Sequence, residues 1–217
     1  MPKKEVSQAF LERELTLHSR YAQKAYDRIY NSASGSLYIL GVVLRIIGSE
    51  EEAQKVEKLV DNMLLDVENE LNAEIERLNK LLENNGLSDV HTSYTFPKVL
   101  SVPVTSPRGA KFLWFVEMLD TIAARLDCLW ISGLLTDKQY TNASFQWQRR
   151  VIRLANKIRN ITSRAVISAK GKDSETQSKV NKVVSEVGID VHAEDISEYE
   201  KEHRHQENND SIAKASV

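Results

Sequence analysis

The Lys and Arg residues of this chain are unevenly distributed. Residues 97–172 hold 13 of them against 4 acidic residues, a local charge of +9 in a chain whose net charge is −2. Residues 149–172 contain eight Lys and Arg and no acid. DNA carries one phosphate charge per ~1.7 Å of its axis, and neutralising these charges releases counterions. The pattern predicts contact with phosphate groups; the alternative is a solvated helix face.

A strand and two helices must position these groups. A helix beginning at Ser106 and Pro107 places Arg108 and Lys111 beside free backbone N–H groups, which attract phosphate oxygens. The alternative for this pair is two exposed cations. Polar side chains on the outward face of the preceding strand are candidates for base contacts. The predicted DNA-contacting residues are Lys98, Ser101, Thr105, Arg108, Lys111, Arg149, Arg150, Arg153, Lys157, Arg159 and Arg164.

Other chemistries have no sequence support. The histidines are scattered, and His203 and His205 lie where rigid partner ligands are not expected, whereas zinc needs about four convergent ligands. The sequence contains no phosphate-binding loop, dinucleotide fingerprint, metalloprotease motif or nucleophile elbow. Cys128 lies in an apolar run and is interpreted as a buried, inert thiol. We expect no enzyme activity, no cofactor and no metal.

The first half of the chain is predicted to be helical. Residues 5–30 have an amphipathic helical pattern, although residues 14–19 (ELTLHS) also alternate as a strand does. Residues 31–36 (NSASGS) predict a turn or a helix start, and residues 37–47 a buried helix. Residues 49–52 (SEEE) form a capping box for a long helix that ends near Asn84. Its apolar positions follow spacings of three and four, as in a coiled coil, and it is strongly acidic.

The strongest strand signal is residues 91–105. Leu100, Val102 and Val104 face one way, while Pro103 on the other face limits the segment to an edge strand or a two-stranded ribbon. Its partner is either the same strand of a second chain or residues 14–19 of this chain. A helix follows to about Ser132, and a capping box at residues 136–139 precedes a last long helix over 144–168.

These elements predict a mainly α fold: a long helical hairpin plus a short β-ribbon and two following helices, similar to a ribbon-helix-helix unit and dimeric. We distinguish residues 1–90, with the acidic helix, from residues 91–172, the DNA-binding part. Residues 173–217 are expected to be a mobile acidic tail, with a weak helix around 191–202. The N-terminus lacks an apolar signal core and residues 37–47 are too short to span a bilayer, which predicts a cytoplasmic protein.

The chain also resembles a known family. The runs ELTLHSRYAQKAYDR, KVLSVPVTSPRGAKFLWFVEMLDTIAARLDCLWISGLLT and FQWQRRVIRLANKI, with the acidic helix between the first two, resemble the AcaB-like proteins of conjugative plasmids and integrating conjugative elements. The resemblance covers roughly residues 12–165. It implies a transcriptional regulator of conjugative-transfer genes that binds promoter DNA, as a homodimer with a ribbon-helix-helix-like reader.

Two functional hypotheses follow. The first is a DNA-binding transcriptional regulator, an activator, whose partners are double-stranded DNA and a second copy of the chain. It predicts no membrane partner and no small-molecule substrate. The second is a structural or adaptor protein of the conjugation machinery, in which the acidic helix binds a partner and the basic helix merely pairs with the acidic one. An affinity for DNA that falls steeply with salt distinguishes the first from the second.

Overall fold

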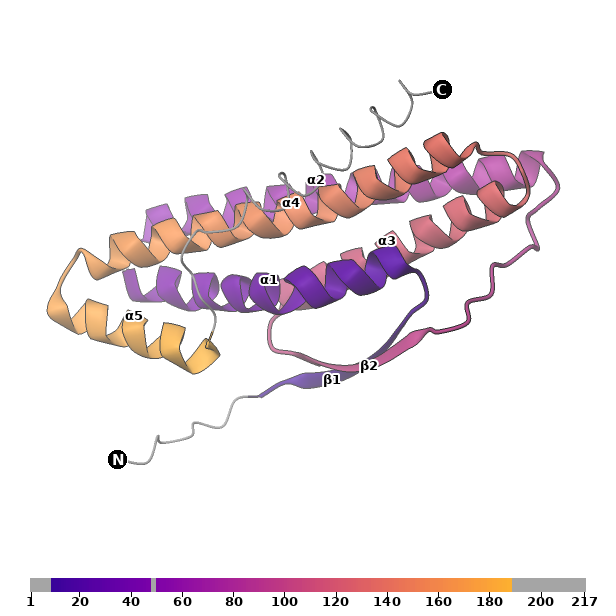
Figure 1. The fold of residues 1–217 in the computed structure, drawn as a ribbon. Coiled ribbons are helices and arrows are strands. Elements are labelled where there is room, and N and C mark those ends of the chain that lie inside the picture. The colour runs from indigo at the N-terminus through magenta and orange to yellow at the C-terminus, as the bar shows by residue number, and fades with distance from the viewer. Residues whose placement is uncertain (1–8, 48–49, 189–217) are drawn as a thin grey trace, which may run out of the picture.

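A computed structural model describes residues 9–47 and 50–188 (Figure 1). The fold is mainly helical, with one two-stranded antiparallel ribbon. The elements in chain order are β1 (Leu11–Leu17), α1 (Arg20–Ile47), α2 (Glu50–Asn84), β2 (Lys98–Val104), α3 (Pro107–Ile131), α4 (Asp137–Lys170) and α5 (Ser174–Val187).

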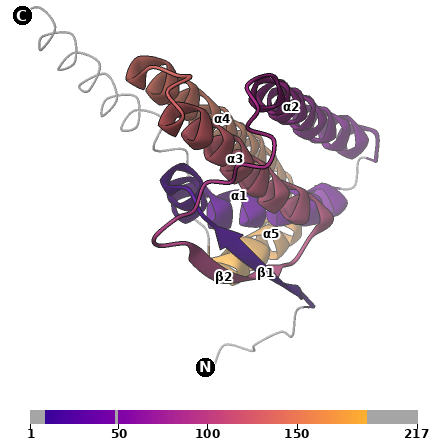
Figure 2. The same ribbon diagram turned by 90° about the vertical axis from the view of Figure 1, so that its right-hand side faces the viewer.

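Helix α3 occupies the middle of the helical layers, packed against α1, α2 and α4 (Figure 2). It begins as predicted: the Ser106 side chain accepts a hydrogen bond from Gly109 N (3.1 Å), and Pro107 occupies the first turn. Buried side chains surround it, Phe112 and Phe115 among the largest. Residues 1–90 and 91–172 both contribute side chains to the hydrophobic core that α3 organises.

Helix α1 runs without interruption through residues 31–36, where the sequence predicts a turn or a helix start. The small side chains in this segment serve packing. Ser34 and Ser36 are buried, and a Cβ atom added at Gly109 of α3 would lie 2.9 Å from Ser34 Oγ. On the other side, Thr162 Oγ1 of α4 donates to Ser36 O (3.1 Å). The short side chains let neighbouring helices approach closely, and this contact outweighs their weak helix propensity.

The start of α1 is fixed by a buried carboxylate from α3. Ser19 is the residue before the helix, and its Oγ accepts from Ala22 N (3.2 Å). Asp120, only 7% exposed, accepts from the backbone N–H groups of His18 (2.9 Å) and Ser19 (2.7 Å). His18 Nδ1 lies 3.0 Å from the same carboxylate. Asp120 therefore satisfies two backbone donors that the helix itself leaves unpaired.

The ribbon forms within one chain. Strand β1 pairs antiparallel with β2, with Leu15 opposite Leu100 and Leu17 opposite Lys98. The sequence leaves two partners open for β2, and the observed partner is the one predicted within residues 14–19 of the same chain. The amphipathic pattern over residues 5–30 predicts a helix throughout, but residues 11–17 form a strand instead. Leu17 and Val102 are fully buried beneath the ribbon, because alternate side chains of both strands point toward the helices.

Helix α2 is the long acidic helix predicted from the sequence, and Gly86 follows it with a φ of 69°. Ser49 of the predicted capping box lies outside the described residues. The buried side chains of α2 follow the predicted spacing and comprise Val60, Leu64, Val67, Leu71, Leu78 and Leu82. They pack mainly against α3. Acidic side chains beside this buried face pair with basic residues of α3 and α4.

Helix α4 starts with the predicted capping box, in which Thr136 and Gln139 satisfy each other's backbone N–H groups. It covers residues 137–170, longer than the predicted 144–168. Beyond it, residues 174–187 form α5, where the sequence suggests a mobile tail. Val180 of α5 is buried against Ile39, Val43 and Val166, which explains why this segment is ordered. The weak helix expected around 191–202 lies outside the described residues.

Candidate nucleic-acid interface

Three cations of α4 form an exposed row, which we call the α4 stripe: Arg153, Lys157 and Arg164. Steps of four and seven residues return to nearly the same side of an α-helix, so the three side chains are aligned over about 16 Å. The opposite side of α4 carries buried residues such as Val151 and Ile158, which fix the rotation of the helix. Among the described side chains, Arg153 and Arg164 have no ion-pair partner.

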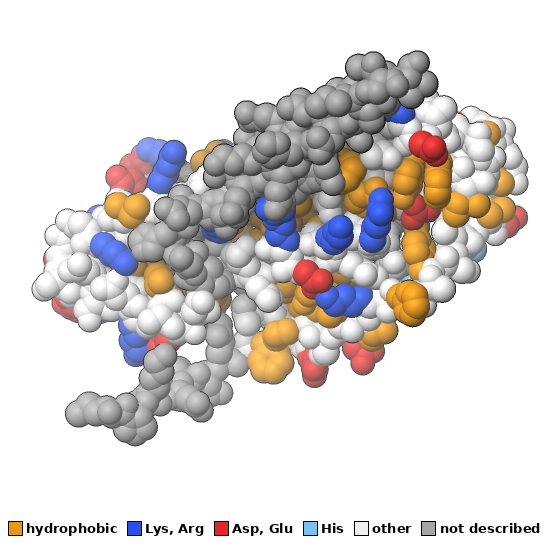
Figure 3. All heavy atoms as spheres, viewed as in Figure 1, with side chains coloured by type: hydrophobic (Ala, Val, Ile, Leu, Met, Phe, Trp, Pro, Cys, Tyr) orange, Lys and Arg blue, Asp and Glu red, His pale blue; other side chains and the backbone are white. Residues whose placement is uncertain are grey.

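A second row of cations, which was not predicted from the sequence, lies on the first half of α1. Arg20, Lys24 and Arg28 are spaced four residues apart and exposed. Their spacing of four residues is the sequence signal for this row, because it places the three cations on one side of a helix. Figure 3 shows Lys and Arg side chains in a row across the middle of one face, over α1 and below α4. Arg20 also donates to Tyr21 Oη (3.0 Å).

The two rows lie at the same level of the bundle. Gln148 Nε2 donates to Tyr21 O (2.9 Å), and Thr162 Oγ1 donates to Ser36 O (3.1 Å). These two contacts set α1 and α4 side by side in one register. Arg153 is therefore level with the segment of α1 that carries Lys24 and Arg28.

Three other predicted DNA contacts are instead paired with α2. Arg108 Nε and Nη2 donate to the two carboxylate oxygens of Asp61 (2.7 and 2.8 Å). Lys111 forms an ion pair with Glu68, and Arg150 forms a two-point ion pair with Glu70. The adaptor hypothesis predicts ion pairs between basic residues and the acidic helix, and such pairs exist for these three residues. Their charges are neutralised by the acidic helix, which leaves them less available to a phosphate.

The ribbon is also a weaker candidate than its sequence suggests. Lys98 is paired with Asp27, and it shares the inward side of the ribbon with Leu100. Ser101 faces outward and donates to Glu12, while Thr105 lies half-buried just after β2. The register places six described residues on the outward face, and none of them is Lys or Arg: Glu12, Glu14, Thr16, Val99, Ser101 and Pro103. Two carboxylates there oppose the approach of DNA.

The remaining predicted contacts, Arg149 and Arg159, are half-buried on α4 and make interactions of their own. Of the eleven residues singled out in the sequence, the structure therefore brings together the three of the α4 stripe as exposed cations. Their common feature is an exposed position on α4, on the side away from its buried residues.

No protein-family model matches the chain, and no curated protein matches it. Its structure is similar to the crystal structure of selenomethionine-containing AcaB from uropathogenic E. coli, with a TM-score of 0.76 and 35% sequence identity. The match covers 83% of this chain and 98% of AcaB. The chain belongs to the AcaB-like family.

Within the described residues of this AcaB-like chain, no group of three His, Cys, Asp or Glu side chains is placed to hold a metal ion. His203 and His205 lie outside the described residues. Cys128 is a buried free thiol, as predicted. Among the described helices, none combines the length and the apolar character needed to cross a membrane.

The ion pairs to α2 are expected to make this AcaB-like fold sensitive to acid. Hydrogen bonds from Arg108 and Arg150 lower the pKa of Asp61 and of Glu70 below their ordinary values of 3.8 and 4.5. A carboxyl group whose pKa is lowered by folding stabilises the protein above its ordinary pKa. That contribution is lost as the pH falls through the lowered value. The free energy of unfolding is therefore expected to decrease as the pH drops below about 4.5.

The measurement is urea denaturation at several pH values, followed by tryptophan fluorescence. The variant Arg108→Met/Arg150→Met removes both partners and should show a shallower decrease in acid than the parent chain. Because all four groups are partly exposed, each pair is expected to contribute only about 1 kcal/mol. Equal slopes for variant and parent would contradict this role of the ion pairs.

Proposed function

We propose that this AcaB-like chain is a DNA-binding transcriptional regulator, an activator of conjugative-transfer genes that acts as a homodimer in the cytoplasm. The observation that carries the proposal is the α4 stripe, exposed on a helix that contains no acid from residue 149 to its end at Lys170. The role in transcription rests on the family resemblance. The physical part, contact with phosphates, rests on the charge arrangement. No catalytic group is needed for either.

The α4 stripe suits a phosphate backbone better than it suits solvent. Arg108, Lys111 and Arg150 form ion pairs with α2 and are less available to phosphate groups. Arg153 and Arg164 are exposed and have no ion-pair partner among the described residues. Each cation that neutralises a phosphate releases most of one counterion, a gain that a solvated helix face does not obtain. The exposed row on α1 lies at the same level of the bundle and extends this proposed contact.

We place the DNA contact on α4 and α1 and not on the ribbon. In a ribbon-helix-helix reader the ribbon joins two chains and enters the major groove. Here both strands come from one chain, and Glu12 and Glu14 occupy the outward face. A homodimer with this ribbon requires a different contact between the copies. Such a homodimer would present one α4 stripe from each copy to each of two half-sites on the DNA.

Binding to DNA is tested by fluorescence anisotropy with two labelled duplexes, one from upstream of a transfer gene and one of shuffled sequence. We expect retention of both at low salt and tighter binding to the upstream duplex. The logarithm of the affinity should fall with the logarithm of salt with a slope of about −3 to −4 per chain, for three or four phosphate contacts. Absence of binding to either duplex at 50 mM salt, a standard low-salt condition, would refute the proposal.

The second candidate function is a non-enzymatic adaptor of the conjugation machinery. It is favoured by the ion pairs that α2 makes with the basic helices and by Leu59 and Leu65, which are about half exposed on that acidic helix. An adaptor would bind its protein partner through α2, and substitution of Leu59 and Leu65 by Gln would weaken that binding while leaving any DNA affinity unchanged. Loss of DNA affinity in that variant would argue against this reading.

A further inference from the structure

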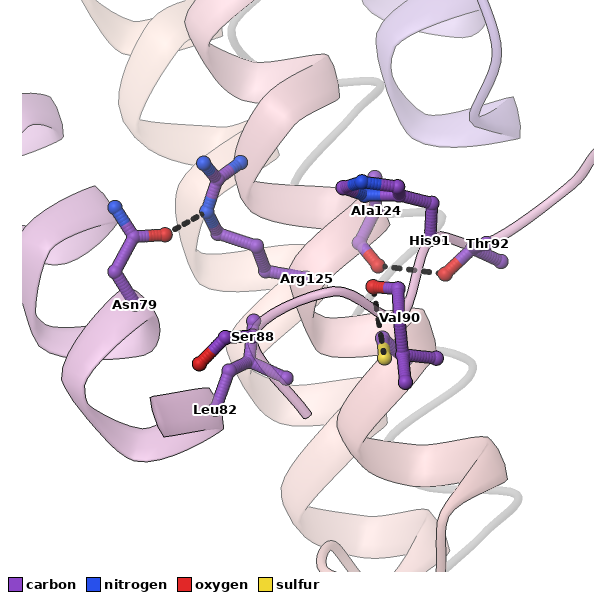
Figure 4. Close-up of a pocket in the computed structure, with 9 residues that line it drawn as sticks. Asn79, Leu82, Ser88, Val90, His91, Thr92, Ala124 and Arg125 are labelled. Carbon is purple, nitrogen blue, oxygen red and sulfur yellow. Dashed lines mark hydrogen bonds between the residues drawn. The ribbon is translucent and has the colours of Figure 1, made fainter. Parts of the chain in front are cut away.

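A small cavity lies where α2, α3 and the connection between α2 and β2 meet (Figure 4). Its volume is about 130 Å³, enough for a small anion or a few water molecules. The connection is held against α3 by two hydrogen bonds, Thr92 Oγ1 to Ala124 O (3.1 Å) and Tyr94 Oη to Asp127 Oδ2 (2.6 Å). The cavity is therefore a fixed feature between ordered elements. Its polar lining includes Asn79, Ser88, His91, Thr92 and Arg125.

Arg125 differs from the other arginines that lie on or against α2. Its Nε donates to the amide oxygen Oδ1 of Asn79, and its Nη1 donates to Thr121 O (3.1 Å). Both acceptors are neutral. Among the described side chains no carboxylate pairs with Arg125, whereas Arg77, Arg108 and Arg150 each hold one.

The charge of Arg125 is therefore partly buried with two neutral acceptors and without a paired carboxylate among the described residues. Burial lowers the pKa of this guanidinium, and no neighbouring charge raises it. A guanidinium carries five N–H donors, and two hydrogen bonds leave the others for a further acceptor. Figure 4 shows the guanidinium of Arg125 on one side of the cavity and the ring of His91 on the other.

We propose that this cavity binds a small oxyanion, a carboxylate or a phosphate group, as an effector of the protein. Arg125 supplies the compensating charge through hydrogen bonds to two oxygens of the ligand. The Ser88 hydroxyl and the Asn79 amide supply neutral donors. The site is separate from the α4 stripe, so it does not depend on the proposed DNA contact. A bound anion would join α2, α3 and the connection to β2, and would stabilise their present arrangement.

The test uses the full chain and two probes, inorganic phosphate and acetate, each compared with chloride at equal ionic strength and pH. At about 100 times its Kd, the anion that binds should raise the Tm by about 5 °C or more. A titration followed by calorimetry gives the Kd. A response to phosphate alone or to acetate alone identifies the ligand class, and both outcomes support the site. No response to either probe at about 50 mM, compared with chloride at the same ionic strength, would overturn it.

Two variants locate the binding. Arg125→Met should weaken the binding at least tenfold, while Arg77→Met on the exposed side of α2 serves as the matched control and should leave it unchanged. Ser88→Asp changes an exposed loop residue and so keeps the fold, but it adds a carboxylate to the cavity lining. It should abolish the response to anions by pairing with Arg125. An unchanged Kd in Arg125→Met, or in Ser88→Asp if the first variant does not fold, would overturn the proposal.

Discussion

The double variant Arg153→Glu/Arg164→Glu is expected to bind duplex DNA about a hundredfold more weakly than the parent chain at 0.1 M salt. Each cation that contacts a phosphate contributes about tenfold under these conditions, through counterion release. Reversal of the charge adds repulsion. The slope of the logarithm of affinity against the logarithm of salt should also become shallower by about 2. Both quantities come from anisotropy titrations of one duplex between about 0.05 and 0.2 M salt.

The matched control is Lys58→Glu/Lys80→Glu on α2, because it makes the same change in net charge at two exposed helical positions. If binding depends only on overall charge, both double variants lose affinity equally, and the assignment to α4 is wrong. The thermal melt should remain close to that of the parent in both, since none of the four side chains is buried. A melt lowered by many degrees in the α4 variant would make its affinity uninformative about direct contact, and Arg153→Gln/Arg164→Gln would then replace it.

Replacement of Asp120 by Ala is expected to lower the free energy of unfolding by about 3 kcal/mol. The substitution leaves the N–H groups of His18 and Ser19 without their acceptor at the first turn of α1. Ser19 is almost completely buried, so water replaces the lost hydrogen bond poorly. Because α1 also packs against α3 and α4, its displacement would weaken the core as well. Urea denaturation followed by circular dichroism measures the change.

Two further variants separate the buried carboxylate from charge in general. Asp120→Asn keeps one acceptor oxygen and should be less harmful than Asp120→Ala. Glu117→Ala removes a carboxylate from the same helix that pairs with exposed Arg13, and should cost less than about 1 kcal/mol. If Asp120→Ala is as mild as Glu117→Ala, the carboxylate does not fix the start of α1.

The sequence predicted those features that depend on a few neighbouring residues. Ser106 and Pro107 predict the start of α3, and Thr136 with Gln139 predicts the start of α4, because a cap is formed by side chains within one turn of the N–H groups they satisfy. The alternation of Leu100, Val102 and Val104 likewise predicts the buried side of β2. The apolar spacing of α2 predicts its length and its contact face, and both are confirmed.

Features that depend on distant segments were decided only by the tertiary structure. Residues 31–36 in isolation predict a turn, but they continue α1 because Gly109 packs against the small side chain of Ser34 and Thr162 bonds the backbone carbonyl of Ser36. The clustering of cations was visible in the sequence, but which of them keep an exposed charge was not. Arg150 lies three residues before Arg153 on one helix, yet α2 supplies Glu70 to Arg150 and no ion-pair partner among the described residues to Arg153. Coulomb attraction weakens with distance and is strongest between charges in contact, and contact between residues 80 positions apart exists only once the helices have packed.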